Sequence, residues 1–262
     1  MKQYTAGFLG AGNMGGALAQ AAIRTAGAEN VILTCKTEAH TRAAAERLGC
    51  ASGPAAEIVR SSRFVFLGVK PQMLSALAEE LGGVIGEAEC VLVSMLAGVT
   101  LERLEALFPG KRILRIMPNT PCAVGSGMLF LCRGSLAAEQ DAEAFRQLMA
   151  CAGRIDEIPE KWMDAASEVA GCGPAFVAMM LEALADAAVK HGVPRALAYE
   201  LASQMAVGAA TLQLKTGAHP GQLKDAVCSP GGSTIRGVQA LEKAGMRAAF
   251  MDAVDAVMDA GR

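Results

Sequence analysis

Residues 5–15 read Thr5-Ala6-Gly7-Phe8-Leu9-Gly10-Ala11-Gly12-Asn13-Met14-Gly15, a short apolar run that leads directly into a glycine-rich segment. An alanine-rich stretch from Gly16 to Ala26 follows, so a G-x-G-x-x-G pattern stands between an expected strand and an expected helix. In that setting the first glycine makes a tight turn, the second admits a pyrophosphate, and the third lets helix and strand pack closely. The pattern predicts a dinucleotide site with these contacts: Gly10, Ala11, Gly12, Asn13, Met14 and Gly15.

Further apolar runs continue the pattern expected of a parallel sheet with helices on both faces. In such a sheet ligands bind at the carboxyl ends of the strands, where polar and proline-containing tails follow three of the runs. The sequence therefore predicts an α/β, Rossmann-type domain over residues 1–158. Its expected strands after the first are residues 31–34, 64–69, 90–93, 113–117, 128–132 and 154–158.

The second expected strand ends without an acidic residue. An enzyme that uses NAD usually carries Asp or Glu there for the ribose hydroxyls, whereas this chain has Lys36 and Thr37. We expect these two residues to accept a 2′-phosphate, so that NADPH is preferred and NADH remains possible. A solvated surface lysine is the alternative, and the neighbouring Glu38 favours that alternative.

Composition narrows the class of protein. Apolar residues make up 52% of the 262, while aromatic residues make up 4%, and 24 Lys and Arg oppose 26 Asp and Glu. The balanced charge predicts no nucleic-acid partner. The apolar runs are shorter than a membrane span and the N-terminus resembles no signal peptide, which predicts a cytoplasmic protein without a membrane partner. The eight cysteines form no Cys-x-x-Cys pair, so we expect no metal site.

The strand signals stop near Pro159, and residues 159–262 are expected to form an all-α domain. In the helix expected from Pro174 to Lys190, the charged residues Glu182, Asp186 and Lys190 lie on one narrow stripe. The stretch from Pro194 to Lys215 is similarly apolar. A domain of this size cannot easily bury two such helices alone, so the sequence predicts an obligate homodimer built on this half.

A late stretch, Ser229-Pro230-Gly231-Gly232-Ser233-Thr234-Ile235, follows a break in the helical pattern. We expect Ser233 and Thr234 to cap a helix from Ile235 to Ala244. The start of such a helix offers unpaired N–H groups and a positive dipole end, which suit a small anion. The alternative is an ordinary glycine-rich turn between two helices.

Several motifs occur together in a fixed order along the chain. They are Gly10-x-Gly12-x-Met14-Gly15, Val69-Lys70-Pro71, Ala97-Gly98, Arg115-Ile116-Met117-Pro118-Asn119-Thr120-Pro121, Gly171-Cys172-Gly173-Pro174-Ala175-Phe176, Pro220-Gly221-Gln222-Leu223-Lys224-Asp225 and the late stretch. In this order the chain strongly resembles the pyrroline-5-carboxylate reductase family, over nearly its whole length. The late motif is far more specific than the glycine loop.

The resemblance implies NAD(P)H-dependent reduction of 1-pyrroline-5-carboxylate to L-proline, the last step of proline biosynthesis. It also implies an active site at a dimer interface, and often a decamer of five dimers. Two departures affect it: Ala226 stands where some members carry Asn, and Ala170 and Cys172 stand where relatives carry serines. By position it implies cofactor contacts at Val69, Lys70, Pro71, Ala97, Gly98, Pro118 and Asn119, and substrate contacts at Glu160, Ser229, Gly231, Gly232, Ser233 and Thr234.

For that reaction we expect the amides of Gly232 to Thr234 to bind the substrate carboxylate. The Thr234 hydroxyl would contact the ring nitrogen, Glu160 would help to place the cationic iminium, and Lys70 completes the expected catalytic set. Two alternatives stay open. A β-hydroxyacid dehydrogenase shares the glycine start but needs a lysine early in the long helix, where this chain has none before Lys190. A nucleotide sensor would bind the cofactor without catalysis.

Overall fold

The structure, a computed structural model, describes residues 2–260. Its internal contacts divide the chain into two units, residues 1–171 and residues 172–262. The sequence places the division after residue 158, so residues 159–171 pack with the first unit although their helical pattern resembles the second. Each unit is described separately below.

The first unit contains a mixed, mostly parallel sheet of eight strands with the order β3-β2-β1-β4-β5-β6-β7-β8. Every neighbouring pair is parallel except β6 and β7. The link between those two, residues 118–126, holds only a 3₁₀ turn, which is too short for the crossover that a parallel pair needs. The strands are β1 (Tyr4–Leu9), β2 (Val31–Thr34), β3 (Ala51–Ser52), β4 (Ser62–Leu67), β5 (Val91–Ser94), β6 (Arg112–Met117), β7 (Gly127–Arg133) and β8 (Gly153–Glu157).

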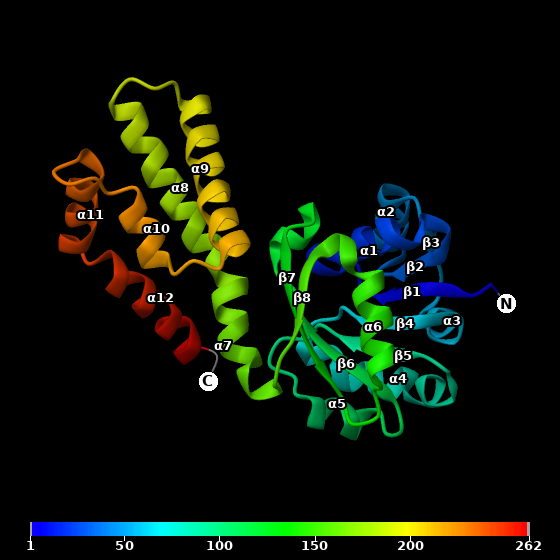
Figure 1. The fold of residues 1–262 in the computed structure, drawn as a ribbon. Coiled ribbons are helices and arrows are strands. Elements are labelled where there is room, and N and C mark those ends of the chain that lie inside the picture. The colour runs from blue at the N-terminus through cyan, green and yellow to red at the C-terminus, as the bar shows by residue number, and fades with distance from the viewer. Residues whose placement is uncertain (1, 261–262) are drawn as a thin grey trace. The chain divides into compact units, whose positions relative to one another are not determined.

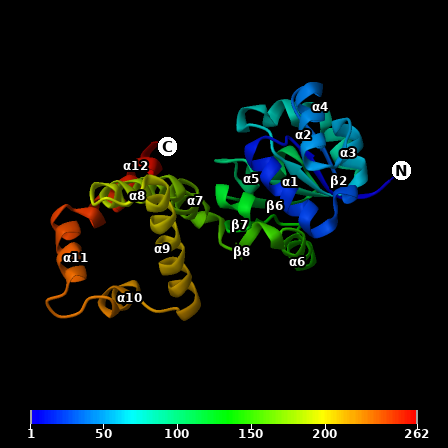
Figure 2. The ribbon, with the colours of Figure 1, turned by 90° about the horizontal axis from the view of Figure 1, so that it is seen from above.

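Helices lie on both faces of this sheet (Figure 2). Successive residues of a strand point to opposite faces, so Phe64 and Phe66 of β4 enter one core cluster while Val65 and Leu67 enter the other. The α-helices of this part are α1 (Asn13–Ala26), α2 (Glu38–Leu48), α3 (Ala55–Ser61), α4 (Leu74–Glu87), α5 (Leu101–Leu107) and α6 (Glu139–Leu148). Short 3₁₀ turns are η1 (Ala28–Asn30), η2 (Pro71–Met73), η3 (Thr120–Val124) and η4 (Ala150–Ala152).

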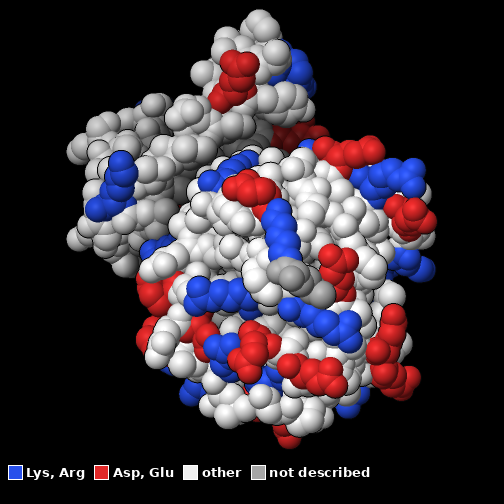
Figure 3. Space-filling model, turned by 90° about the vertical axis from the view of Figure 1, so that its right-hand side faces the viewer, with Lys and Arg blue, Asp and Glu red and all other residues white. Residues whose placement is uncertain are grey.

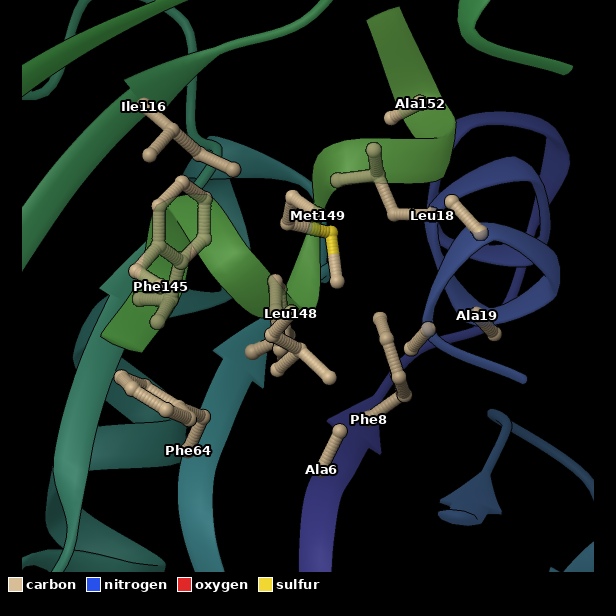
Figure 4. Packing of buried hydrophobic residues seen from close by; sticks show 14 of the residues in the cluster. Ala6, Phe8, Leu18, Ala19, Phe64, Ile116, Phe145, Leu148, Met149 and Ala152 are labelled. Atoms are coloured by element: carbon tan, nitrogen blue, oxygen red, sulfur yellow. The ribbon is translucent and has the colours of Figure 1, made fainter. Parts of the chain in front are cut away.

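Four phenylalanine rings lie in the core cluster between the sheet and α1 and α6. Phe8 and Phe66 stack with ring centroids 4.3 Å apart, and Phe145 of α6 lies 6.2 Å from Phe66. Figure 4 shows Phe145 beside Phe64 and Ile116, with Leu148 and Met149 extending the same cluster toward α1. Aromatic pairs at these distances add to the free energy of burial, and they fix α6 against the sheet.

A continuous helical stretch leads out of the sheet. It consists of η5 (Glu160–Trp162), α7 (Met163–Ser167), a π-helical turn η6 (Glu168–Cys172) and α8 (Gly173–Lys190). Among the described residues this helix, Glu160–Lys190, is long and apolar enough to cross a membrane by length and composition alone. Charged residues interrupt this helix, among them Glu168 and Glu182, so its uninterrupted apolar runs are nonetheless short.

The second unit is helical over its described residues, as expected. It continues with α9 (Arg195–Thr216), α10 (Pro220–Ala226), α11 (Ser233–Lys243) and α12 (Met246–Ala260), and α8 and α9 lie side by side (Figure 1). Of α8 only Ala185 is buried, and of α9 only Ala198 and Ala202. Apolar helices with so little burial leave large hydrophobic surfaces without a partner in a single chain.

Charged residues of both signs are interspersed over the face of the molecule in Figure 3, with no large patch of one sign. This agrees with the nearly balanced composition. It offers no electrostatic footprint for a nucleic acid on that face.

Candidate functional site

The glycine loop lies at the point where the strand order reverses, because β1 stands between β2 and β4. Gly10 has a φ of 106°, and a Cβ on this residue would lie 2.5 Å from the carbonyl oxygen of Gly68. A Cβ on Gly15 would collide with the carbonyl oxygen of Gly10. Both glycines are therefore required by close backbone packing at the carboxyl ends of β1 and β4.

Gly12 differs from its two neighbours, because a Cβ there would meet no atom within 4 Å. It is the N-cap of α1, with no side-chain cap. Among the described residues no acceptor takes the N–H groups of Gly12, Asn13 or Met14. Open space beside free N–H groups at the start of a 14-residue helix fits a dinucleotide pyrophosphate.

The turn after β2 is polar and organised around Thr37. The Thr37 hydroxyl accepts the backbone N–H of His40 at 3.3 Å and lies 2.9 Å from Nδ1 of its ring. Lys36 is exposed next to it, while Glu38 pairs with Arg42 at 3.2 Å. Because Glu38 has its own cationic partner, it does not neutralise Lys36, and the turn suits an anionic group.

Two exposed segments continue the carboxyl edge of the sheet. Lys70 is exposed as the N-cap of η2, directly after the half-buried Val69 and before Pro71. Between β5 and α5, Ala97 and Gly98 form an exposed loop tip. Strand order places the β4 and β5 ends next to the glycine loop, so these segments can line one cofactor site.

Asn119 differs from the expectation that it faces the cofactor. Its side chain is buried, Nδ2 donates to the carbonyl oxygen of Ala170 at 2.9 Å, and Oδ1 accepts the N–H of Met128 at 2.9 Å. The amide thus fixes the π-helical turn η6 to the end of β6. The Asn119 side chain can contact a cofactor only if these hydrogen bonds break, so a contact in this conformation would have to come from its main chain. The neighbouring Pro118 is also buried.

Glu160 also has a different environment from the one expected of a substrate ligand. Its Oε1 atom lies 2.6 Å from Nη1 of Arg115 and accepts the backbone N–H of Leu101 at 2.7 Å. Two protein donors therefore occupy one oxygen of this carboxylate. Glu160 therefore links β6 to the start of α5, a structural role that argues against the substrate contact expected from the sequence.

The late stretch forms the start of α11, but its caps differ from the expectation. Gly232 is the N-cap without a side-chain hydrogen bond, so Ser233 and Thr234 lie within the first turn. The Gly232 N–H is already taken by the carbonyl oxygen of Ser229 at 3.0 Å, which removes it from the expected anion donors. Among the described residues no acceptor takes the N–H groups of Ser233, Thr234 or Ile235.

Gly231, which precedes this turn, has a φ of 69°, a conformation that favours glycine. The chain therefore reverses sharply between Ser229 and α11, and three consecutive free N–H groups remain at the helix start. These groups, with the Thr234 hydroxyl on the same turn, form a candidate carboxylate site.

The cysteines and histidines provide no metal centre. Within residues 2–260 no three of the His, Cys, Asp and Glu side chains are grouped so as to hold a metal ion, and the eight cysteines are free thiols. Burial, together with the nearby carboxylate of Glu160, raises the pKa of the Cys132 thiol to about 11. This thiol is neutral at pH 7 and unsuited to nucleophilic chemistry.

Comparison with known proteins finds relatives that match nearly the whole chain. Residues 160–262 match the family model for pyrroline-5-carboxylate reductase dimerisation, and residues 5–98 match that for NADP oxidoreductase, coenzyme F420-dependent. Pyrroline-5-carboxylate reductase 3 of Macaca fascicularis is 40% identical over 257 residues, which cover 95% of this chain and 92% of that protein. The chain belongs to the pyrroline-5-carboxylate reductase family.

Other members of the pyrroline-5-carboxylate reductase family match equally well. The Pisum sativum enzyme is 40% identical over 99% of this chain and 95% of its own length. The crystal structure of the Plasmodium falciparum pyrroline carboxylate reductase with NADP bound superposes with a TM-score of 0.87 at 30% identity, covering 100% of this chain and 98% of that one. The match to a dimerisation region also supports the self-association predicted from the apolar helices.

Two residues of this pyrroline-5-carboxylate reductase family member are important for the site, yet sequence reasoning assigned neither. Gly68 packs against Gly10, since a Cβ on Gly68 would collide with the Gly10 carbonyl oxygen. Arg115 carries a buried charge beside Glu160. Gly68 directly precedes the Val69-Lys70-Pro71 motif, and Arg115 is the first residue of the motif that ends at Pro121. The available signals were a glycine at a strand end and an arginine in an apolar strand.

Proposed function

We propose that this chain reduces 1-pyrroline-5-carboxylate to L-proline with a nicotinamide cofactor. The observation that carries the proposal is the first turn of α11, where the N–H groups of Ser233, Thr234 and Ile235 are free beside the Thr234 hydroxyl. That arrangement suits the carboxylate and ring nitrogen of a small cyclic imino acid. The full-length relatives named for this activity support the assignment.

The cofactor supplies the hydride when bound, so the protein residues act by binding and positioning. The free amides at the start of α1 hold the cofactor pyrophosphate, and Lys70 and the Ala97–Gly98 loop line its other end. The α11 turn holds the substrate carboxylate, and the Thr234 hydroxyl contacts the ring nitrogen. Fixed N–H dipoles and exclusion of water around the iminium then stabilise the transition state.

The apolar helices and the match to a dimerisation region support a site completed by a second copy of the chain. We propose that the carboxylate site of one subunit serves the cofactor site of its partner. A decamer of five dimers is our proposal for the full assembly, and the cytoplasm is our proposal for its location.

NADPH is our proposed preferred cofactor, because the exposed Lys36 stands beside Thr37 at the end of β2 without an acidic residue that could hold the ribose hydroxyls. Isothermal titration of the wild-type protein and of Lys36→Ala with NADPH and NADH tests this. We expect Lys36→Ala to weaken NADPH binding and to leave NADH binding unchanged. Equal losses for both cofactors would contradict the 2′-phosphate contact.

The activity is tested by following NADPH oxidation with 1-pyrroline-5-carboxylate and without a second substrate, and by following NADP+ reduction with 3-hydroxyacids. We expect turnover with the cyclic imine alone. Turnover of a hydroxyacid would favour the dehydrogenase alternative, and cofactor binding without any turnover would favour the sensor.

Thr234→Val tests the proposed contact between the Thr234 hydroxyl and the ring nitrogen. We expect the variant to fold and to lose about 1–3 kcal/mol of transition-state stabilisation, the usual cost of leaving a buried polar partner unpaired. The matched control is Thr216→Val at the end of α9, whose hydroxyl only bonds Leu212 of its own helix and Ala218 next to that end. An unchanged kcat/KM for Thr234→Val would remove this hydroxyl from the site.

A further inference from the structure

Arg115 carries a buried positive charge in the middle of β6. Its side chain is 3% exposed, and its Nε atom is buried without a hydrogen-bond partner. Glu160 is its close counter-ion at 2.6 Å, while Asp164 lies 3.4 Å from Nη2 and is 72% exposed. Because the second carboxylate is mostly hydrated, Glu160 provides most of the compensation that a buried guanidinium requires.

The same carboxylate oxygen also reaches the start of α5. Leu101 is the first residue of that helix, and its N–H donates to Oε1 of Glu160 at 2.7 Å. The Thr100 hydroxyl satisfies a different donor, the N–H of Arg103, at 3.2 Å. A negative charge next to a helix start is favourable, so Glu160 completes the capping that Thr100 begins.

This contact lies at the base of a loop that belongs to the candidate cofactor site. The loop between β5 and α5 exposes Ala97 and Gly98, while Leu96 and Val99 on either side are buried. Its two ends are therefore fixed by different means: the β5 end by the sheet, and the α5 end by Glu160. Through Arg115 the same group is joined to β6, whose tail leads to Pro118 and Asn119.

We propose that Glu160 is a positioning residue for the cofactor, which holds the Ala97–Gly98 loop in its binding conformation through the Leu101 N–H. The inference rests on the proposed cofactor site and replaces the substrate contact assigned to Glu160 from sequence. Arg115 is a second positioning residue, since its guanidinium orients the Glu160 carboxylate and holds it against the sheet.

The Leu101→Pro variant removes the hydrogen bond from the Leu101 N–H to Glu160 and keeps both residues of the buried Arg115–Glu160 ion pair. Proline is favoured at the first position of a helix and removes only the N–H that Glu160 accepts. The preceding Thr100 already has the extended conformation that a following proline requires, with φ −77° and ψ 160°. Leu101→Ala is the matched control, because it loses the same side chain and keeps the N–H.

We expect Leu101→Pro to bind NADPH at least fivefold more weakly than Leu101→Ala in isothermal titration, with equal melting temperatures. At saturating NADPH, the KM for 1-pyrroline-5-carboxylate should agree within twofold between the two variants. Equal NADPH affinity for the proline and alanine variants would overturn the proposal.

Variants of Glu160 distinguish positioning from substrate binding. Glu160→Gln keeps an oxygen that can accept from Leu101, so we expect NADPH affinity within about threefold of wild type, whereas Glu160→Ala should lose tenfold or more. Arg112→Met is the control, because Arg112 lies on the same strand but pairs with Asp141 at 2.8 Å. Weaker binding of tetrahydrofuran-2-carboxylate with unchanged NADPH affinity in both Glu160 variants would restore the substrate contact and refute the proposal.

These measurements remain informative if the proposed reaction is wrong. A wild-type protein that binds NADPH but fails to reduce 1-pyrroline-5-carboxylate would refute the proposed function alone, while the comparison of Leu101→Pro with Leu101→Ala still tests the link through Glu160. Should Glu160→Ala fail to fold, Arg115→Met combined with Glu160→Gln removes the buried charge and leaves the acceptor for Leu101. That double variant should retain NADPH affinity within threefold, and a tenfold loss would contradict the proposal.

Discussion

Glycines at the carboxyl edge of the sheet are required for two different physical reasons. Gly10 and Gly15 are constrained by neighbouring backbone atoms, so any side chain there meets the protein itself. Gly12 faces open space, so a side chain at this position would contact only a bound ligand. One motif therefore combines residues needed for folding with a residue needed for a ligand.

Gly12→Ala and Gly15→Ala test this difference. We expect Gly12→Ala to keep its free energy of unfolding within about 1 kcal/mol, the range of substitutions that create no clash or cavity, and to weaken NADPH binding at least tenfold. Gly15→Ala should lose both stability and binding, because its methyl group collides with the Gly10 carbonyl oxygen. Urea unfolding and isothermal titration measure the two quantities; intact NADPH affinity in Gly12→Ala would place the pyrophosphate elsewhere.

Cys132 gives the fold a dependence on alkaline pH. Its thiol donates to the carbonyl oxygen of Ile158 at 2.9 Å, and burial raises its pKa from the ordinary value of 9.0 to about 11. The folded protein therefore keeps a proton that the unfolded chain releases first. The contribution to stability is complete below pH 9 and is lost as the pH rises toward 11.

We expect the free energy of unfolding to fall more steeply between pH 9 and pH 11 in the wild-type protein than in Cys132→Ala. Urea unfolding at several pH values in that window measures the slope. Cys151→Ala serves as the control, since it removes a half-buried thiol at another position of the same unit. Parallel slopes for wild type and Cys132→Ala would show that this thiol titrates normally.

At the scale of elements, the helices around the sheet are held in place in two ways: by packing against the sheet and by hydrogen bonds that cap their first turns. α6 packs Phe145 against Phe64 and Phe66, and its first turn contains Asp141, whose Oδ2 accepts the N–H of Ala138 at 3.1 Å. α5 is short and is held at its start by Thr100 and by Glu160. Local sequence explains the packing of α6 better than the capping of α5, because the acceptor for an N–H at a helix start can come from a distant segment.

Phe145→Ala should destabilise the first unit by about 3–5 kcal/mol, because the side chain is fully buried and its removal leaves a cavity among aromatic neighbours. Thermal or urea unfolding measures this loss. Gln147→Ala on the exposed side of the same helix is the control and should stay within about 0.5 kcal/mol. A loss below 1 kcal/mol for Phe145→Ala would mean that α6 contributes little to the core.

At the scale of the whole molecule, the apolar helices of the second unit require a partner. Leu197, Leu201 and Met205 follow one another at helical spacing along α9 and are each about half exposed. The match of residues 160–262 to a dimerisation region indicates what covers them. The same cover accounts for the apolar stretch Glu160–Lys190, whose composition alone would also permit a membrane span.

Met205→Glu should shift the protein toward monomers, because a charge would be buried in the contact between copies. Size-exclusion chromatography with light scattering at micromolar concentration measures the mass. Met73→Glu provides the same change at an exposed methionine of the first unit and should leave the mass unchanged. An unaltered mass for Met205→Glu would exclude this stripe from the interface.

The sequence by itself determined the elements with strong local signals. The G-x-G-x-x-G pattern, the apolar strands and the helical second half depend on periodicity and on glycine conformation, which neighbouring residues specify. The strand of residues 31–34 and the helix that begins near Pro174 appear in the structure within one residue of the expectation.

Only the tertiary structure decided which polar groups are free. Asn119 and Glu160 are binding residues by pattern, yet the first bonds Ala170 and Met128, and the second bonds Arg115 and Leu101. Gly232 likewise gives its N–H to Ser229. A buried hydrogen bond joins groups that are far apart in the chain as readily as near neighbours, so no local pattern reveals whether a donor or acceptor remains available to a ligand.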